Sequence, residues 1–188
     1  FEISKSMGTS RKGFLVTFSG VDGAGKSTII ESIKSELEKK HRRRVVVLRH
    51  RPSILPIISA LKYGKKNAEQ KSASTLPRQG TNSGKLSSLL RFTYYLFDYV
   101  IGQWWIHFRH VRKDTIVLYD RYYFDFINDS KRSNISLNSS FTERFYVLIK
   151  KPAFNFFLWA APEVILKRKQ ELEHDTIVAL TNQYTHLF

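Results

Sequence analysis

Residues 20–27, "GVDGAGKS", carry the clearest chemistry in the sequence. They fit the pattern G-x-x-x-x-G-K-[ST], in which backbone N–H groups of a glycine-rich loop bind phosphate oxygens. In this pattern the lysine, here Lys26, reaches the β- and γ-phosphates, and the hydroxyl of Ser27 binds Mg²⁺. The pattern therefore predicts ATP and Mg²⁺ as ligands. The residues predicted to surround the nucleotide are Gly20, Asp22, Gly23, Ala24, Gly25, Lys26, Ser27 and Thr28.

Asp22 is an unexpected residue in such a loop, because a carboxylate that faced the phosphates would be repelled by them. We expect it to turn toward a second substrate. There it would accept hydrogen bonds from a sugar hydroxyl or from an arginine such as Arg51 or Arg121. The alternative is an aspartate that only forms a turn and touches no ligand.

A second acid follows the apolar run "TIVLYD" (115–120). Ligands of parallel sheets bind at the carboxyl ends of the strands, so Asp120 is predicted to lie beside the glycine-rich loop and to hold Mg²⁺ directly or through water. The alternative is that Asp120 caps a following helix. Arg121 comes next, where it could stabilise phosphoryl charge or bind an acceptor phosphate, unless it forms only a surface ion pair.

Strands and helices alternate around these residues. Apolar or β-branched runs predict strands over 12–19, 44–49, 115–120 and 154–160. Amphipathic or apolar segments predict helices over 25–40, 86–113, 140–151, 162–173 and 175–188. The alternation predicts an α/β fold with a parallel sheet and helices on both faces. The polar segment at about 63–85 contains glycine and proline and is predicted to be a mobile loop.

Three stretches together resemble the thymidylate kinase family of P-loop kinases. "FSGVDGAGKST" (18–28) is similar to the family's phosphate loop, "YDRYYFD" (119–125) to its Asp-Arg-Tyr motif, and "APEVILKRKQELEHDTI" (161–177) to the helix that leads into its lid. Their order and spacing agree over about 170 residues. The resemblance implies a five-stranded parallel sheet of the P-loop NTPase fold. It also implies an enzyme that transfers the γ-phosphoryl group of ATP to a nucleoside monophosphate, with dTMP as the default acceptor and Mg²⁺ as cofactor.

The resemblance also implies roles for individual residues. Lys26, Ser27 and Thr28 would hold ATP and the metal, and Asp120 would serve the Mg²⁺ site. Asp22 would face the acceptor sugar, and Arg121 would contact the acceptor. Arg168, in a lid-like segment at about 163–175, would close over the transferring phosphates. The catalytic residues predicted in this way are Lys26, Arg121 and Arg168.

The acceptor side departs from the family pattern. Asp98 matches the family's Asp-Arg pair on its long helix, but Tyr99 stands where the arginine is expected, and Arg91, two turns earlier, is a candidate substitute. "RHRPS" (49–53) replaces an Arg-Glu-Pro-Gly turn and leaves Arg51 as the counterpart of its arginine. These changes leave open a kinase with another acceptor, such as a nucleoside or a sugar phosphate. The predicted acceptor contacts are Asp22, Arg51, Arg91, Phe92, Tyr99 and Arg121.

The aromatic residues between 92 and 99 have two readings, as core residues of a buried helix or as rings that stack on an acceptor base. The sequence ends at Phe188, where the family places one further strand and the loop that lines adenine. We therefore expect that strand to be missing and predict no adenine contact. Residues 1–188 are predicted to form a single domain.

Composition limits the remaining possibilities. The formal net charge of +15 suggests anionic partners, and a nucleotide-dependent nucleic-acid-binding protein is a further alternative, although no nucleic-acid-binding motif is present. The most apolar stretch, 96–108, is too short and too interrupted to span a membrane. The absence of cysteine fits a reducing compartment, so a cytoplasmic enzyme is predicted. Small nucleotides are the predicted partners, and a homodimer is left open.

Overall fold

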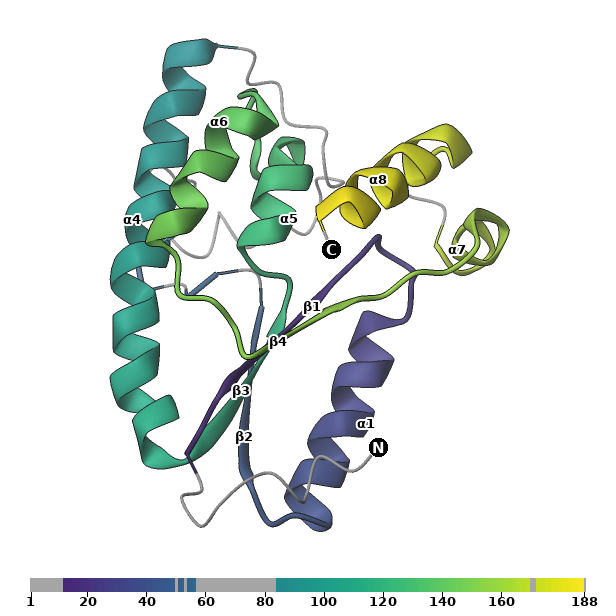
Figure 1. Ribbon diagram of the computed structural model, residues 1–188. Helices are drawn as coiled ribbons and strands as arrows, with labels where there is room; N and C mark the ends of the chain where they lie inside the picture. Colours follow the sequence, from purple (N-terminus) through teal and green to yellow (C-terminus); the bar gives the residue numbers. More distant parts are fainter. Residues whose placement is uncertain (1–11, 50, 53, 57–83, 170–171, 188) are drawn as a thin grey trace.

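A four-stranded parallel sheet forms the centre of the computed structural model, which describes residues 12–49, 51–52, 54–56, 84–169 and 172–187 (Figure 1). Its strands are β1 (Leu15–Ser19), β2 (Arg44–Arg49), β3 (Thr115–Asp120) and β4 (Phe154–Phe157). They lie in the order β2-β3-β1-β4 with parallel neighbours throughout. The predicted α/β class and parallel sheet are therefore confirmed. The described residues contain these four strands and not the fifth that the family resemblance implies.

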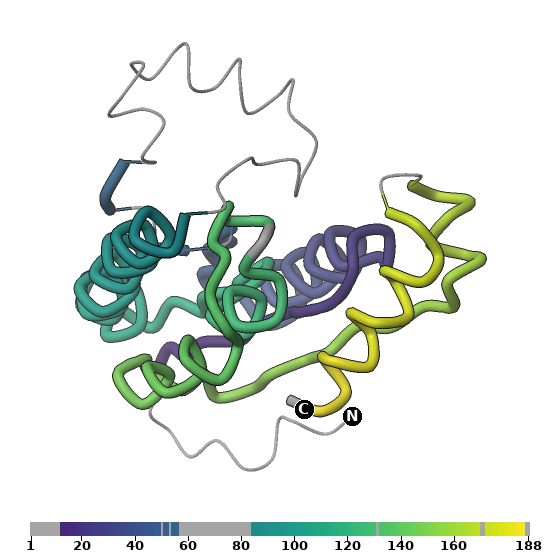
Figure 2. The backbone as a smooth tube through the Cα atoms, turned by 90° about the horizontal axis from the view of Figure 1, so that it is seen from above, coloured from purple at the N-terminus to yellow at the C-terminus, as the bar shows by residue number. Residues whose placement is uncertain are grey.

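Helices connect and cover the strands. The α-helices are α1 (Lys26–Lys39), α4 (Lys85–Arg109), α5 (Tyr123–Asn128), α6 (Ser139–Arg144), α7 (Pro162–Arg168) and α8 (His174–Leu187). The short 3₁₀ segments are η1 (Val111–Lys113), η2 (Ser130–Ser133) and η3 (Phe145–Leu148). Figures 1 and 2 both show α4 on one side of the molecule and the α7–α8 pair on the opposite side.

The two faces of the sheet are buried against different helices, because successive side chains of a strand point to opposite faces. Val16 and Phe18 of β1 pack with Ile30 of α1 on one face. Leu15 and the β3 residues Val117 and Tyr119 pack on the other face against α4, α5 and the segment around η3. Residues that alternate along β1 and β3 thus belong to two separate hydrophobic clusters, as expected for a sheet covered on both sides.

Several predicted helices have different bounds in the structure. The helix predicted over 86–113 ends at Arg109 and is followed by η1. The helix predicted over 140–151 is only α6 and η3, and 150–151 precede Pro152, a position where proline disfavours the helical conformation. α5 was not predicted. The loop predicted over 63–85 lies outside the described residues, except that Gly84 precedes α4 and Lys85 begins it.

The strand register brings the two chemical motifs to the same edge of the sheet. Phe18 of β1 lies opposite Asp120 of β3, and the glycine-rich loop starts two residues after Phe18. The carboxyl ends of β1 and β3 therefore place the loop, Asp120 and Arg121 side by side, as the sequence predicts for a ligand site at this edge.

Candidate active site

Glycines shape the loop between β1 and α1. Gly20 has φ +142°, and a Cβ on it would lie 2.3 Å from the carbonyl oxygen of Leu158 before α7. Gly25 precedes α1 with φ +89°, a left-handed conformation that glycine adopts without strain. The first backbone N–H groups of α1 have no partner within the helix, and together with the helix dipole they favour a phosphate at this end.

Lys26 is buried within the loop that it follows. Its side chain is only 6% exposed, and its Nζ donates hydrogen bonds to the carbonyl oxygens of Gly20 (2.8 Å) and Val21 (2.9 Å). Burial lowers the pKa of Lys26 to about 8; Arg121 adds to this effect, while Asp22 and Asp125 oppose it. The ammonium group is thus held against the backbone of the glycine-rich loop, where the terminal phosphates of a nucleotide are expected.

Two oxygen-bearing residues that line one cavity fit a magnesium ion. Ser27 at the start of α1 and Asp120 at the end of β3 both line a cavity of about 690 Å³. The Oδ1 atom of Asp120 is buried and has no hydrogen-bond partner among the described residues. A buried carboxylate oxygen without a partner is costly unless a ligand satisfies it, and oxygen ligands suit Mg²⁺. The residues present therefore fit the ion, and their metal-binding role stays a prediction.

Asp22 holds two arginines against the loop. Its Oδ1 accepts a hydrogen bond from Arg121 and its Oδ2 accepts one from Arg132, while Lys26 Nζ lies 3.7 Å from Oδ1. Burial opposes ionisation of Asp22, but Arg121, Arg132 and Lys26 outweigh it and hold the pKa of Asp22 below its usual range. Of the two arginines expected as partners, Arg121 makes this contact and Arg51 does not. Sequence reasoning missed Arg132 as a partner.

Arg121 lies in a strained conformation between two carboxylates. Its φ is +75°, which is uncommon for a residue with a side chain, and its backbone N–H bonds to the carbonyl oxygen of Phe18. Its guanidinium donates to Asp22 and, over 2.8 Å, to Asp125. Burial opposes the charge on Arg121, but Asp125 and Asp22 raise its pKa, so the side chain stays charged.

Asp125 is the centre of a buried hydrogen-bond network that sequence reasoning missed. Besides Arg121, it accepts hydrogen bonds from Ser19 Oγ (2.9 Å), from the Tyr122 N–H (3.1 Å) and from Tyr184 Oη (2.6 Å). The network joins the end of β1, the start of α5 and the C-terminal helix α8. The motif "YDRYYFD" contained Asp125, but its partner Tyr184 is 59 residues away and gave no signal.

Arg168 reaches the loop from the lid-like segment. It is the last residue of α7, lines the cavity beside Lys169, and donates from one guanidinium nitrogen to the Gly23 carbonyl oxygen over 3.3 Å. The packing of Ile165 of α7 with Val21 places this helix end over the loop. The lid role predicted for 163–175 stays a prediction.

Arg51 and Arg91 lie apart from this cavity. Arg51 donates to the buried carboxylate of Asp98 over 2.6 Å, and its guanidinium lies 4.9 Å from the ring centre of Tyr95. Arg91 is partly buried on α4, and its Nε has no hydrogen-bond partner among the described residues. Neither lines the cavity with Lys26. Their roles toward an acceptor stay predictions. The ion pair with Asp98 fixes the position of the Arg51 side chain.

Phe92 and Tyr99 are core residues in the structure. Phe92 is 1% exposed and stacks with Phe126, and Tyr99 is 4% exposed and packs edge-to-face against Tyr123. Rings enclosed in this way match the alternative interpretation as core residues, because α4 buries this face against α5. The acceptor contacts predicted for Phe92 and Tyr99 stay predictions.

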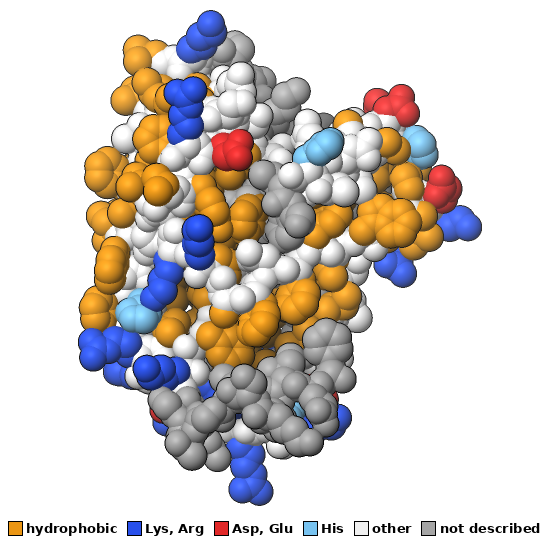
Figure 3. All heavy atoms as spheres, viewed as in Figure 1, with side chains coloured by type: hydrophobic (Ala, Val, Ile, Leu, Met, Phe, Trp, Pro, Cys, Tyr) orange, Lys and Arg blue, Asp and Glu red, His pale blue; other side chains and the backbone are white. Residues whose placement is uncertain are grey.

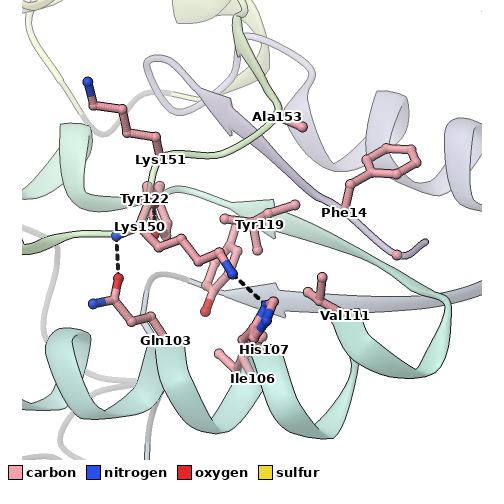
Figure 4. A pocket seen from close by; sticks show the side chains of 12 residues that line it. Phe14, Gln103, Ile106, His107, Val111, Tyr119, Tyr122, Lys150, Lys151 and Ala153 are labelled. Carbon is pink, nitrogen blue, oxygen red and sulfur yellow. Dashed lines mark hydrogen bonds between the residues drawn. The ribbon is translucent and has the colours of Figure 1, made fainter.

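A second hollow lies away from the phosphate loop (Figure 4). Its volume is about 310 Å³, and it lies between α4, the start of β1 and the approach to β4. Lys150 and His107 point toward each other at its rim, and Gln103 accepts a hydrogen bond from the Lys150 N–H. It contains none of the residues predicted for ATP or an acceptor, and we assign it no role.

The fold and the site define a class of protein. A parallel sheet carries a glycine-rich loop between β1 and α1, an acid lies at the end of β3, and an arginine reaches the loop from α7. Together these features make the protein a P-loop phosphotransferase of the nucleotide kinase type. The sequence model of the thymidylate kinase family matches residues 18–185. The chain therefore belongs to the thymidylate kinase family.

Solved structures support the fold assignment. The thymidylate kinase from Ehrlichia chaffeensis is similar with a TM-score of 0.59 and 17% sequence identity, over 94% of this chain and 84% of that chain. At this identity the likeness supports the fold and not the details of the acceptor site. A comparison with curated proteins found no match. Within the described part of the chain, no helix is long and apolar enough to cross a membrane.

Proposed function

We propose that this protein transfers the γ-phosphoryl group of ATP to a nucleoside monophosphate, with dTMP as the default acceptor. The arrangement of Lys26, Ser27 and Asp120 around one cavity carries the proposal, because it offers a cation for phosphates and oxygen ligands for their metal. Membership of the thymidylate kinase family supports the choice of acceptor.

The reaction is a displacement at phosphorus. An oxygen of the acceptor phosphate bonds to the γ-phosphorus, and the bond from that phosphorus to the oxygen bridging the β-phosphate breaks, so that ADP leaves. Lys26 binds the terminal phosphates, and Arg168 approaches them from α7. Ser27 and Asp120 would hold Mg²⁺, which would supply charge neutralisation for the transferring phosphates. No strong general base is required, because positioning and charge stabilisation supply most of the acceleration.

A coupled assay of ADP release tests this function. Purified protein with ATP and Mg²⁺ is offered a panel of nucleoside monophosphates, thymidine and sugar phosphates. We expect dTMP to stimulate ADP release most. Stimulation by a nucleoside or a sugar phosphate alone would favour a kinase with another acceptor. If no monophosphate stimulates release, the proposal is wrong; steeply salt-dependent retention on DNA would then favour nucleic-acid binding.

We also propose that the enzyme is a homodimer that pairs through α4. Leu90, Phe97 and Trp104 recur every seven residues, and Ile101 and Phe108 repeat this spacing on the same face of the helix. All five are about half exposed or more. Figure 3 shows hydrophobic side chains along the edge of the molecule that α4 forms. Exposing roughly 100 Å² each, they would supply about 500 Å² of the ~800 Å² that one partner contributes to a standard interface.

Light scattering after gel filtration checks the dimer. We expect twice the mass of one chain for the wild type and the mass of one chain for Trp104→Glu, because a carboxylate buried in an apolar interface costs several kcal/mol. Trp159→Glu is the matched control, since Trp159 is equally exposed but lies between β4 and α7. A wild type that elutes as one chain at micromolar concentration would exclude the proposal. A cytoplasmic location stays a prediction.

A further inference from the structure

The cations of the active-site cavity differ in how far the protein already neutralises them. Arg121 has a side chain that is 5% exposed and is bound by the carboxylates of Asp22 and Asp125. Turning Arg121 toward a ligand would leave the buried Asp125 without its charge partner, which is costly. Arg121 is therefore better suited to fixing the geometry of the site than to binding an incoming anion.

Arg132 differs from Arg121 in exposure and in the number of carboxylates that bind it. It comes from η2, its side chain is 23% exposed, and it lines the same cavity. Asp22 is its one carboxylate partner in the described part of the chain, bound through a single guanidinium nitrogen. A guanidinium carries five N–H donors in a planar fork, so Arg132 retains donors for a second anion while Asp22 holds it in place.

Arg132 and Arg168 contact different parts of the glycine-rich loop. Arg168 approaches the loop at the carbonyl of Gly23, whereas Arg132 is held at Asp22, whose other oxygen contacts Arg121. Lys26 Nζ is also within 4 Å of Asp22, so Arg132 and Lys26 flank the same carboxylate. An anion bound by Arg132 would thus lie next to the phosphate-binding lysine, within reach of a transferred group.

We propose that Arg132 binds the phosphate of the acceptor and thereby makes the enzyme select a phosphorylated acceptor over the corresponding nucleoside. The proposal rests on the proposed function, in which the acceptor is a monophosphate. Asp22 then acts as the anchor of Arg132. This role adds to the sugar contact that the family resemblance implies for Asp22, because each carboxylate oxygen that accepts from an arginine can accept a further hydrogen bond.

Kinetics of Arg132→Ala test the role of Arg132. We expect the KM for dTMP to rise roughly 10- to 100-fold, the effect of losing a hydrogen bond between charged groups, and the KM for ATP to change less than about threefold. Arg132→Lys should recover part of the loss. Arg112→Ala is the matched control; it removes the same charge from an exposed position on η1 and should leave both constants unchanged. Equal changes in both constants, or none, would overturn the proposal.

Calorimetry separates this proposal from the proposed function. The affinities of wild type and Arg132→Ala are measured for dTMP and for thymidine, which lacks the phosphate. We expect the wild type to prefer dTMP and the variant to lose most of that preference, with its thymidine affinity unchanged. This result supports the role of Arg132 even if no turnover is detected. A variant that keeps the wild-type preference overturns that role even if the enzyme phosphorylates dTMP.

Discussion

Replacing Lys26 by methionine is expected to lower kcat/KM for phosphoryl transfer by at least about 10²- to 10³-fold, the loss that follows when one charge-stabilising group is removed from an active site. Methionine keeps the length and most of the packing of the side chain but carries no ammonium. Lys26 is the cation that the loop itself holds, through the carbonyl oxygens of Gly20 and Val21. Initial rates at varied ATP and dTMP measure the loss.

The fold should survive this change. Two opposing effects act on it: the carbonyl oxygens of Gly20 and Val21 lose a donor, while the protein no longer buries a charge whose pKa is already lowered. We expect the free energy of unfolding to stay within about 1 kcal/mol of the wild type. Lys39→Met, in the last turn of α1, is the control and should keep full activity. An unfolded Lys26→Met protein would contradict a purely chemical role for Lys26.

The strands were predictable because their signal is local. β2 and β3 have the bounds that their β-branched and apolar runs predict, and β1 is followed by the glycine-rich loop that the pattern requires. α5 could not be found in this way. Its sequence, "YFDFIN", is rich in aromatic residues with modest helix propensity. The Asp125 carboxylate accepts a hydrogen bond from the Tyr122 N–H at the start of the helix, but tyrosine is not among the residues by which a helix start is recognised in a sequence.

The donor side of the site was predictable and the acceptor side was not, for a physical reason. Glycines, Lys26 and Ser27 act through one continuous segment, so their spacing alone places them around a phosphate. Contacts between distant segments decide the other side: Asp22 meets Arg132 across 110 residues. Similarly, Phe92 and Tyr99 are buried because α5 covers α4, and no pattern in α4 itself shows which of its aromatic residues face that helix.

Replacing Asp125 by asparagine is expected to lower the free energy of unfolding by about 3 kcal/mol or more, the cost of breaking a buried ion pair from one side. Asparagine has nearly the shape of aspartate, but its amide group donates hydrogen bonds. Asp125 accepts from Ser19 and Tyr122 on one oxygen and from Arg121 and Tyr184 on the other, so either orientation of the amide turns a donor toward donors. Urea unfolding measures the loss.

Matched variants decide whether the network or the charge alone is responsible. Asp175→Asn removes a fully exposed carboxylate at the start of α8 and should change the free energy of unfolding by less than about 0.5 kcal/mol. Tyr184→Phe removes a single donor to Asp125 and should cost roughly 1–3 kcal/mol. The kinase rate of Asp125→Asn should also fall, because Arg121 keeps its left-handed conformation only while its partners hold it. If Asp125→Asn unfolds within about 1 kcal/mol of the wild type, the buried network does not stabilise the site, since its loss should cost about 3 kcal/mol.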